Sequence, residues 1–381
     1  MYLKTLHLRQ FRNYQDTKVE LSAPKTILVG NNAQGKSNLL EAVELLATLR
    51  SHRASRDRDL VLDGAAEGKI TATLERQTGS VDLALTLRRN GRRTVTLNHQ
   101  SLRRQMEFLG TLNAVQFSSL DLDLVRGGPD QRRNWLDTLL IQLEPFYAHI
   151  LQQYNKILRQ RNALLKRARE LGSDKDFNQL PANSELALWD AQLVTAGTRV
   201  TRRRARALQR LAPLAEFWHG AISGSKEILE IKYAPNVTLE QDDPESVKLA
   251  FFNKIQQRAS LEQHHGTTLV GPHRDEVEFL INQTPARLYG SQGQQRTLVL
   301  ALKLAEIKLI EEVVGEPPLL LLDDVLAELD PNRQNQLLDA IQERFQTLIT
   351  TTHLSAFDRS WLNSSQILSV QAGQLYPQAL G

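Results

Sequence analysis

The chain has 381 residues, 41% of them hydrophobic, which is enough for two or three domains with buried cores. It contains no cysteine, which excludes disulfide frameworks and zinc-thiolate sites and is typical of the reducing cytoplasm. The net charge is only +4. No stretch reaches the ~18–20 uncharged apolar residues that span a bilayer, and the first residues lack the apolar segment of a signal peptide. We therefore expect a cytoplasmic protein with no membrane association.

The first part of the chain has the pattern of an α/β unit. Alternating apolar residues over 3–11 predict a half-buried strand, and 18–22 and 25–30 predict further strands. Apolar residues at helical spacing predict a helix over 37–50. Residues 68–98 read as three antiparallel strands with turns at Thr78–Gly79 and Asn90–Gly91, and 113–118 as another strand.

The spacing of the apolar residues changes from strand-like to helical near residue 130. Long helices are predicted over 131–172 and 185–220, separated by a polar loop at 172–184. A strand at 227–233 and a short helix around Val247–Arg258 follow, and strand patterns return over 267–290, 317–325 and 347–353. We predict an α/β fold in which residues 1–125 and 263–381 form one domain, while residues 126–262 form an inserted, mainly helical lobe.

A phosphate-binding loop is predicted at GNNAQGKS, which has the spacing G-x-x-x-x-G-K-[ST]. Its residues are Gly30, Asn31, Asn32, Ala33, Gln34, Gly35, Lys36 and Ser37. Backbone N–H groups of such a loop surround the β-phosphate, the Lys36 ammonium contacts the β- and γ-phosphates, and the Ser37 hydroxyl is a Mg²⁺ ligand. A chance match is the alternative, but an apolar strand precedes the loop and an apolar helix follows it.

A second half of such a site is predicted at LLLLDD, residues 319–324. Four apolar residues predict a strand buried on both faces, and α/β folds bind ligands at the carboxyl ends of such strands. Asp323 would then belong to the Mg²⁺ shell, and Asp324 would polarise an attacking water. Alone, the pattern could equally be a strand that ends in solvated acids.

The stretch YGSQGQQRTLVLALKLAE, residues 289–306, begins with a Ser-x-Gly turn and continues as an apolar helix. Ser291 could simply cap this helix, with Gln294 as its capping-box partner. A helix N-terminus beside glycine is also an anion site. The order of elements, with LLLLDD, AELDP and a strand ending in His353 after this helix, favours a nucleotide-binding role.

At this point the chain resembles the RecF family of ABC-type ATPases, over nearly its whole length. The motifs that carry the resemblance are LRQFRNY (8–14), GNNAQGKSNLLEAVELL (30–46), RGGPDQRRNWLD (126–137), ILRQRNALLK (157–166), VGPHRDEVEF (270–279), YGSQGQQRTLVLALKLAE (289–306) and LLLLDDVLAELD (319–330). The resemblance implies an ABC-type P-loop ATPase head that binds ATP and Mg²⁺ and dimerises when ATP binds.

In such heads the Ser-x-Gly signature contacts the nucleotide bound by a second subunit. The resemblance therefore implies that Ser291, Gly293, Gln294 and Asp330 act across a dimer interface. His353 matches the position of the switch histidine that senses the γ-phosphate, and Gln116 is a candidate for the Q-loop glutamine.

The chain departs from the family pattern in two places. Segment 117–120 lacks the proline and the glutamate of the family's Phe-x-Pro-Glu-Asp-Leu motif, which bears on the role of Gln116. The presumed base is Asp324, where many ABC-type ATPases have glutamate. The shorter side chain suits slow hydrolysis, and thus a weak, DNA-stimulated ATPase that works as a switch.

Basic residues are concentrated between Lys156 and Arg210, which hold thirteen Lys or Arg against five Asp or Glu. Arg202, Arg203, Arg206 and Arg210 share a broad helical face, and Arg53 and Arg56 belong to a second basic segment, 49–58. Either could be a solvated helix face. The resemblance favours contact with the DNA backbone, and because no aromatic residues are interleaved, duplex is favoured over stacked single strands.

The resemblance implies a protein of DNA repair, replication and recombination. It would clamp duplex DNA beside single-stranded gaps and assist recombinase loading with RecR- and RecO-like partners. One alternative is the ATPase subunit of a transport complex. Another is an SMC-like structural ATPase, although that would need long heptad coiled coils and the predicted helices are too short.

Overall fold

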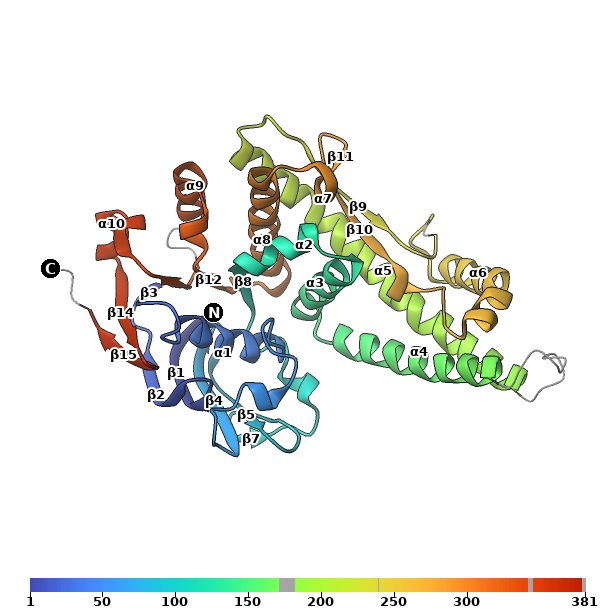
Figure 1. The fold of residues 1–381 in the computed structure, drawn as a ribbon, viewed down its shortest axis with the longest axis horizontal. Coiled ribbons are helices and arrows are strands. Elements are labelled where there is room, and N and C mark those ends of the chain that lie inside the picture. Colours follow the sequence, from blue (N-terminus) through green and yellow to red (C-terminus); the bar gives the residue numbers. More distant parts are fainter. Residues whose placement is uncertain (171–181, 239, 342–344, 379–381) are drawn as a thin grey trace. The chain divides into compact units, whose positions relative to one another are not determined.

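The computed structural model describes residues 1–170, 182–238, 240–341 and 345–378. The chain divides into two compact units (Figure 1). The first unit comprises Met1–Leu122, Leu214–Ile228 and Ser291–Gly381, and the second comprises Asp123–Pro213 and Leu229–Gly290. Residues 263–290, which the sequence pattern placed with the α/β domain, therefore group with the helical segments.

The first unit contains a six-stranded, mainly parallel sheet. Its order is β15 (Gln374–Pro377), β14 (Ser365–Gln371), β3 (Lys25–Val29), β13 (Thr347–Thr351), β12 (Leu319–Asp323) and β8 (Ala114–Ser118). All neighbours are parallel except β14 and β15. The strand β12 is buried along its four leucines, as expected for a central parallel strand. N-terminal β3 lies between two strands from the C-terminal part of the chain.

A second, antiparallel sheet of the first unit faces the other side of the helix that follows the predicted phosphate loop. Its strands are β2 (Tyr14–Glu20), β1 (Tyr2–Phe11), β4 (Glu67–Arg76), β5 (Gly79–Arg88), β6 (Thr94–Leu97) and β7 (Gln100–Ser101). Helix α1 (Lys36–Thr48) contacts β5 of this sheet and β8, β12 and β13 of the parallel sheet. One hydrophobic core joins α1 to both sheets. The predicted three-stranded meander is confirmed.

The described part of the first unit also contains α8 (Gln292–Val314), α9 (Pro331–Ile341) and α10 (Arg359–Asn363), together with residues 214–223 at the end of a longer helix. Short 3-10 helices cover Asp57–Asp59, Gln105–Phe108, Ser119–Leu122, Val325–Glu328 and Leu354–Ala356. Helix α8 is buried over most of its length and packs against β8. It ends at Gly315, whose φ of 81° suits a glycine C-cap. Strands β14 and β15 were not predicted from the sequence.

The second unit is mainly helical. Its elements are α2 (Asp123–Arg126), α3 (Pro129–Leu143), α4 (Tyr147–Glu170), the part of α5 (Ala182–Ser223) that precedes Leu214, β9 (Leu229–Ala234), α6 (Pro244–His265), a 3-10 turn (Pro272–Arg274), β10 (Glu276–Ile281), β11 (Thr284–Pro285) and α7 (Ala286–Tyr289). The predicted loop 172–184 is shorter, because α5 already begins at Ala182, and its remainder lies outside the described residues. In the described segments, no helix is long and apolar enough to cross a membrane.

Residues 263–290 belong with the helices because β10 pairs antiparallel with β9 and packs on α3. Buried ion pairs strengthen this unit. Arg204 binds Asp137 and Asp275, with nitrogen–oxygen distances of 2.9 and 3.1 Å. Helix α6 is longer than the predicted 247–258 because Asp243 caps its start, accepting the backbone N–H of Ser246 at 2.7 Å.

Candidate functional site

The predicted phosphate loop connects β3 to α1 in the first unit. The Lys36 ammonium is buried and donates to the carbonyls of Gly30 (2.8 Å) and Asn31 (3.0 Å). Gly35 has a φ of 115°, and a Cβ there would lie 2.7 Å from Asn13 Nδ2, so only glycine fits this position. The loop thus has the tight, glycine-dependent turn that places backbone N–H groups around a phosphate.

Two turns from distant parts of the sequence support this loop. From the β1–β2 turn, Asn13 Nδ2 donates to the Gln34 carbonyl (2.9 Å) and Tyr14 Oη donates to the Gly35 carbonyl (2.9 Å). From the β14–β15 turn, the Gly373 N–H donates to the same Gln34 carbonyl (3.0 Å). The sequence analysis did not assign a role to Asn13 or Tyr14, although both lie in the LRQFRNY motif.

The two predicted acids lie at the carboxyl end of β12, separated from β3 by one strand. Ser37 Oγ and Thr350 Oγ1 each donate to Asp323 Oδ1 at 2.7 Å, and the Asp324 N–H donates to Thr350 Oγ1 at 2.9 Å. The Asp324 backbone is left-handed, with a φ of 54°. Burial raises the pKa of Asp324, the charge of Lys36 lowers it, and that of Asp323 raises it, with a net increase.

The oxygen atoms at this point are suited to Mg²⁺. Ser37 Oγ and Asp323 Oδ1 are hard ligands that already lie 2.7 Å apart. Mg²⁺ takes few protein ligands and completes its shell with water and phosphate oxygens. The described residues contain no cluster of three or more His, Cys, Asp or Glu that could form an all-protein metal site.

The Ser-x-Gly turn begins α8. Ser291 and Gln294 form a complete capping box: the Ser291 hydroxyl accepts the Gln294 N–H (3.2 Å), and Gln294 Oε1 accepts the Ser291 N–H (2.8 Å). Gln294 Nε2 also donates to Glu227 (2.9 Å). The hydrogen bonds that Lys36 and Ser37 donate go to carbonyls of the phosphate loop and to Asp323, and not to the Ser-x-Gly turn. The capping role weighed from the sequence is therefore present.

Asp330 is connected to the signature turn through an arginine. The Asp330 carboxylate forms an ion pair with Arg333, whose hydrogen bond is the main cause of the lowered pKa of Asp330. Arg333 Nε donates to Thr297 Oγ1 of α8 (2.8 Å), and its guanidinium lies 3.3 Å from where a Cβ on Gly293 would be. Gly293 thus leaves room for Arg333.

His353 follows β13 and is exposed. Its backbone is fixed by Thr351, whose hydroxyl donates to the His353 carbonyl (2.9 Å) and accepts its N–H (3.3 Å). Because β13 lies between β3 and β12, this residue extends from the same strand ends as the loop and the acids.

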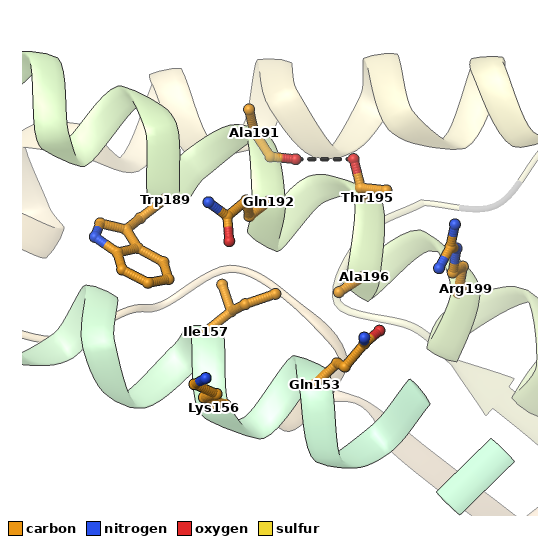
Figure 2. A pocket seen from close by; sticks show the side chains of 9 residues that line it. All are labelled: Gln153, Lys156, Ile157, Trp189, Ala191, Gln192, Thr195, Ala196 and Arg199. Carbon is orange, nitrogen blue, oxygen red and sulfur yellow. Dashed lines mark hydrogen bonds between the residues drawn. The ribbon is translucent and has the colours of Figure 1, made fainter. Parts of the chain in front are cut away.

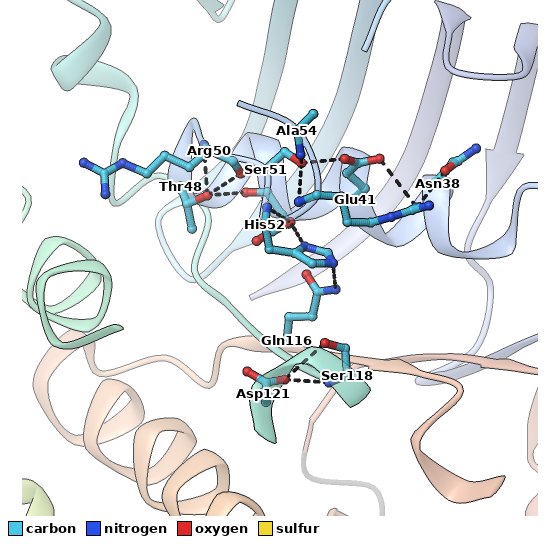
Figure 3. Close-up of polar contacts among 12 residues, drawn as sticks. Asn38, Glu41, Thr48, Arg50, Ser51, His52, Ala54, Gln116, Ser118 and Asp121 are labelled. Carbon is cyan, nitrogen blue, oxygen red and sulfur yellow. Dashed lines mark hydrogen bonds and ion pairs between the residues drawn. The ribbon is translucent and has the colours of Figure 1, made fainter. Parts of the chain in front are cut away.

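Gln116 lies on β8 in contact with His52, with 3.3 Å between the Gln116 and His52 Nε2 atoms (Figure 3). The segment that departs from the family pattern folds as a capped turn, in which Asp121 accepts the N–H of Ser118 at 2.6 Å. Asp121 also pairs with Lys303 of α8 at 3.0 Å. An aspartate three residues after the strand thus fixes this turn without the missing proline and glutamate.

Most of the predicted DNA-binding arginines are already paired within the chain. Arg202 and Arg206 both bind Asp242, and Arg203 binds Glu144. Arg53 donates to Asn38 (2.9 Å), whereas Arg56 and Arg210 are exposed. The shared face predicted for the helix exists, but acids that are distant in the sequence partly neutralise it.

A groove in the second unit combines aromatic and basic side chains that the sequence analysis did not connect. It has a volume of about 510 Å³ and lies between α4 and α5. Trp189 and Arg199 of α5 and Lys156 of α4 line it, together with Gln153, Ile157, Ala191, Gln192, Thr195 and Ala196 (Figure 2). The lining residues of α4 and those of α5 are separated by more than thirty positions, so no local pattern reveals the groove.

The structure therefore brings Lys36, Ser37, Asp323 and Asp324 together at the ends of parallel strands. A phosphate loop between β3 and α1, acids after β12 and a capped Ser-x-Gly-Gln helix define a P-loop ATPase head of the ABC type. The model of the RecF/RecN/SMC N terminal domain matches residues 2–374. The chain belongs to the RecF family of DNA replication and repair proteins.

Relatives and solved structures support this membership over the whole chain. The RecF protein of Nostoc punctiforme is 75% identical over 377 residues, covering 99% of this chain and 100% of the relative. That of Rippkaea orientalis is 68% identical over 379 residues, with the same coverage. The ATP complex of the recombination mediator protein RecF of the RecFOR pathway is 32% identical, with a TM-score of 0.90 over 99% of this chain and 98% of that one.

More distant structures share the fold alone. The Smc head domain of Pyrococcus furiosus is 16% identical, with a TM-score of 0.56 over 100% of this chain and 96% of that one.

Proposed function

We propose that this chain is an ATP-dependent DNA-binding protein of recombinational repair and replication-fork maintenance, acting in the cytoplasm. In this proposal ATP binding joins two copies, which clamp duplex DNA beside a single-stranded gap and assist recombinase loading with RecR- and RecO-like mediators. Hydrolysis is slow and releases the complex. The observation that carries the proposal is the assembly of Lys36, Ser37, Asp323 and Asp324 in a family of repair proteins.

The roles of the site residues follow from their positions. Lys36 exchanges its two loop carbonyls for the β- and γ-phosphates, because a phosphate is the stronger partner for an ammonium. Ser37 and Asp323 would hold Mg²⁺, which neutralises charge on the phosphates when it is bound. Asp324 accepts a proton from the attacking water, and its raised pKa makes it a stronger base for that transfer than an ordinary aspartate.

The second half of the site is proposed to come from another copy of the chain. Ser291, Gly293, Gln294 and Asp330 lie at the start of α8 and before α9, and their hydrogen bonds serve the helix cap, Glu227 and Arg333. A capped helix N-terminus remains an anion site for an incoming γ-phosphate. His353, at the end of β13, is proposed to sense the same phosphate.

A binding assay on gapped duplex DNA, with and without ATP, tests the proposal. We expect ATP to increase retention of the chain on gapped duplex, and Lys36→Met to remove that increase. A transport-complex ATPase subunit would show no dependence on gapped DNA. Equal retention with and without ATP, and by the parent and Lys36→Met, would contradict the proposed function.

A further inference from the structure

His52 lies between a carboxylate of α1 and Gln116 of β8 (Figure 3). Its Nδ1 is 2.6 Å from Glu44 Oε2, and its Nε2 is 3.3 Å from Gln116 Nε2. A carboxylate only accepts hydrogen bonds, so Nδ1 carries the proton that faces Glu44. In the neutral ring Nε2 is then an acceptor, and the Gln116 amide N–H donates to it. This contact fixes which way the Gln116 amide points.

The other end of that amide is an open acceptor. Gln116 Oε1 is buried and has no hydrogen-bond partner within the described part of the chain. A buried acceptor left without a donor destabilises the fold, so such an atom is kept where a ligand or water can supply the donor. Gln116 is opposite Leu321 in the β8–β12 pairing, two residues before Asp323. The open acceptor therefore belongs to the strand beside the acids of the nucleotide site.

His52 is held in place by the helix that starts at Lys36. The segment 49–58 is anchored on α1 at the buried Glu41 and the half-buried Glu44, since Ser51 Oγ donates to Glu41 Oε1 (2.5 Å) while the His52 ring binds Glu44. Arg12 Nε and Nη2 also donate to Glu41, at 2.9 and 2.7 Å, and Glu41 is fully buried. These contacts leave the imidazole little freedom, so its position relative to α1 is fixed.

We propose that His52 is a positioning residue for ATP hydrolysis: held by Glu44, it orients Gln116 so that Gln116 Oε1 accepts a hydrogen bond from the attacking water. This inference rests on the proposed function. A role in loop packing alone would explain the His52–Glu44 pair, but it gives no reason for a buried Gln116 oxygen to remain open.

The kinetic test compares steady-state hydrolysis by the full chain and its variants. His52→Ala should lower kcat by about tenfold or more, because a misplaced water attacks the γ-phosphate poorly, while KM for ATP stays close to the parent value since the Lys36 and Ser37 contacts are intact. His52→Gln, whose side chain can still accept at the Nε2 position, should recover most of kcat. The matched control is His99→Asn on an exposed turn with φ of 65°, a conformation that asparagine tolerates.

The pH profile separates positioning from packing. The carboxyls facing His52 are Glu44 and Glu41 on α1 and Asp121 after β8. Burial lowers the pKa of His52. The hydrogen bond to Glu44 and the negative charges of the three carboxylates raise it, and the net change is an increase. A protonated ring cannot accept from Gln116, so kcat falls on the acid side. Glu44→Gln keeps an acceptor for Nδ1–H but removes the charge, so the acid limb should move to lower pH. If His52 only packs against α1, the acid limb of the pH dependence of kcat should stay at the same pH in Glu44→Gln.

A readout that does not depend on hydrolysis is the side-chain amide signal of Gln116 in ¹⁵N NMR of the nucleotide-free protein. It should titrate with His52 and change in His52→Ala. An unchanged Gln116 signal, or parental kcat and acid limb in His52→Ala and Glu44→Gln, overturns the positioning role. A parent chain that hydrolyses no ATP, with the Gln116 signal still titrating, contradicts the proposed function but not the His52–Gln116 contact.

Discussion

Lys36 illustrates how a single side chain is prepared for a ligand. Its ammonium is buried and satisfied by two loop carbonyls, which keeps a desolvated charge from destabilising the first unit. Those carbonyls are weaker partners than phosphate oxygens, so binding can replace them. The residue is therefore pre-positioned, and its substitution is expected to affect binding more than folding.

Lys36→Met should reduce ATP affinity by at least about 100-fold, because hydrogen bonds to a charged group contribute about 1.5–3 kcal/mol each. Titration calorimetry with ATP measures the change, and circular dichroism checks the fold. The matched control is Lys18→Met, which removes an exposed lysine of β2 that pairs only with Glu20 at 3.6 Å. Parental ATP affinity in folded Lys36→Met would contradict the P-loop assignment.

Asp324→Asn should keep ATP bound but slow hydrolysis by about 100-fold or more, the range of general-base catalysis. Asparagine tolerates the left-handed backbone of this position, so the variant should fold. The raised pKa of Asp324 means that this carboxylate loses its charge at a higher pH than an ordinary aspartate would. Asp323→Asn should instead weaken Mg²⁺-dependent binding. Normal turnover by Asp324→Asn would exclude the base role.

At the level of elements, the start of α8 has an observed role in capping and a proposed role at an interface, and the two can be separated. Its capping box satisfies backbone groups at the first turn, and the same turn is proposed to meet the nucleotide of another copy. Both depend on Ser291, but a cap needs only a hydroxyl acceptor, whereas an interface also needs space around the turn. Two substitutions at one position can therefore separate stability from assembly.

Ser291→Ala should cost about 1 kcal/mol of stability, the usual effect of losing a serine cap, and should still permit ATP-dependent dimerisation. Ser291→Arg should cost a similar amount and bind ATP, because Lys36 and Ser37 are unchanged, but it should fail to dimerise since the side chain fills the space for the γ-phosphate. Thermal unfolding and size exclusion with ATP give the two readouts. An ATP-dependent dimer of Ser291→Arg would rule out the proposed interface.

Several elements could be predicted because their signals are local. The strand–loop–helix around Lys36, the leucine run before Asp323 and the cap at Ser291 are each readable from fewer than twenty adjacent residues. The contacts that support them are not local. Asn13 and Gly373 meet at Gln34 only after the chain has folded, and Asp242 neutralises Arg202 and Arg206 across about forty positions. No periodicity in one sequence reveals such pairings, which is also why His52 was missed.

At the level of the whole molecule, the arginines of α5 need a test that separates DNA contact from internal pairing. Charge reversal of Arg203 and Arg206 should weaken duplex binding and lower its salt dependence, because fewer counterions are released. It also breaks pairs with Glu144 and Asp242. The exchanged variant Arg203→Glu with Glu144→Arg restores one pair, and the exposed Arg210→Glu provides a matched single change. Unaltered binding in all of these variants would assign the arginines to internal structure.

The proposed composite site makes a further prediction about mixed dimers. Neither Lys36→Met nor Ser291→Arg alone should form a normal ATP-dependent dimer, since every site in either pure dimer is defective. In the mixture, one site of the dimer carries both defects and the other carries neither, so partial assembly should return. Size exclusion with ATP, using one labelled variant, measures this recovery. Absence of mixed dimers, with each variant folded, would argue against sites shared between copies.

The pairing of the chain's two ends has a consequence for synthesis. Strand β3, which leads into the phosphate loop, is flanked by β13 and β14, and the loop itself accepts a hydrogen bond from Gly373. A ribosome has therefore made almost all of the 381 residues before the N-terminal loop has its neighbours. A truncated chain that stops before residue 347 would carry the full GNNAQGKS sequence and yet lack the strands that shape it.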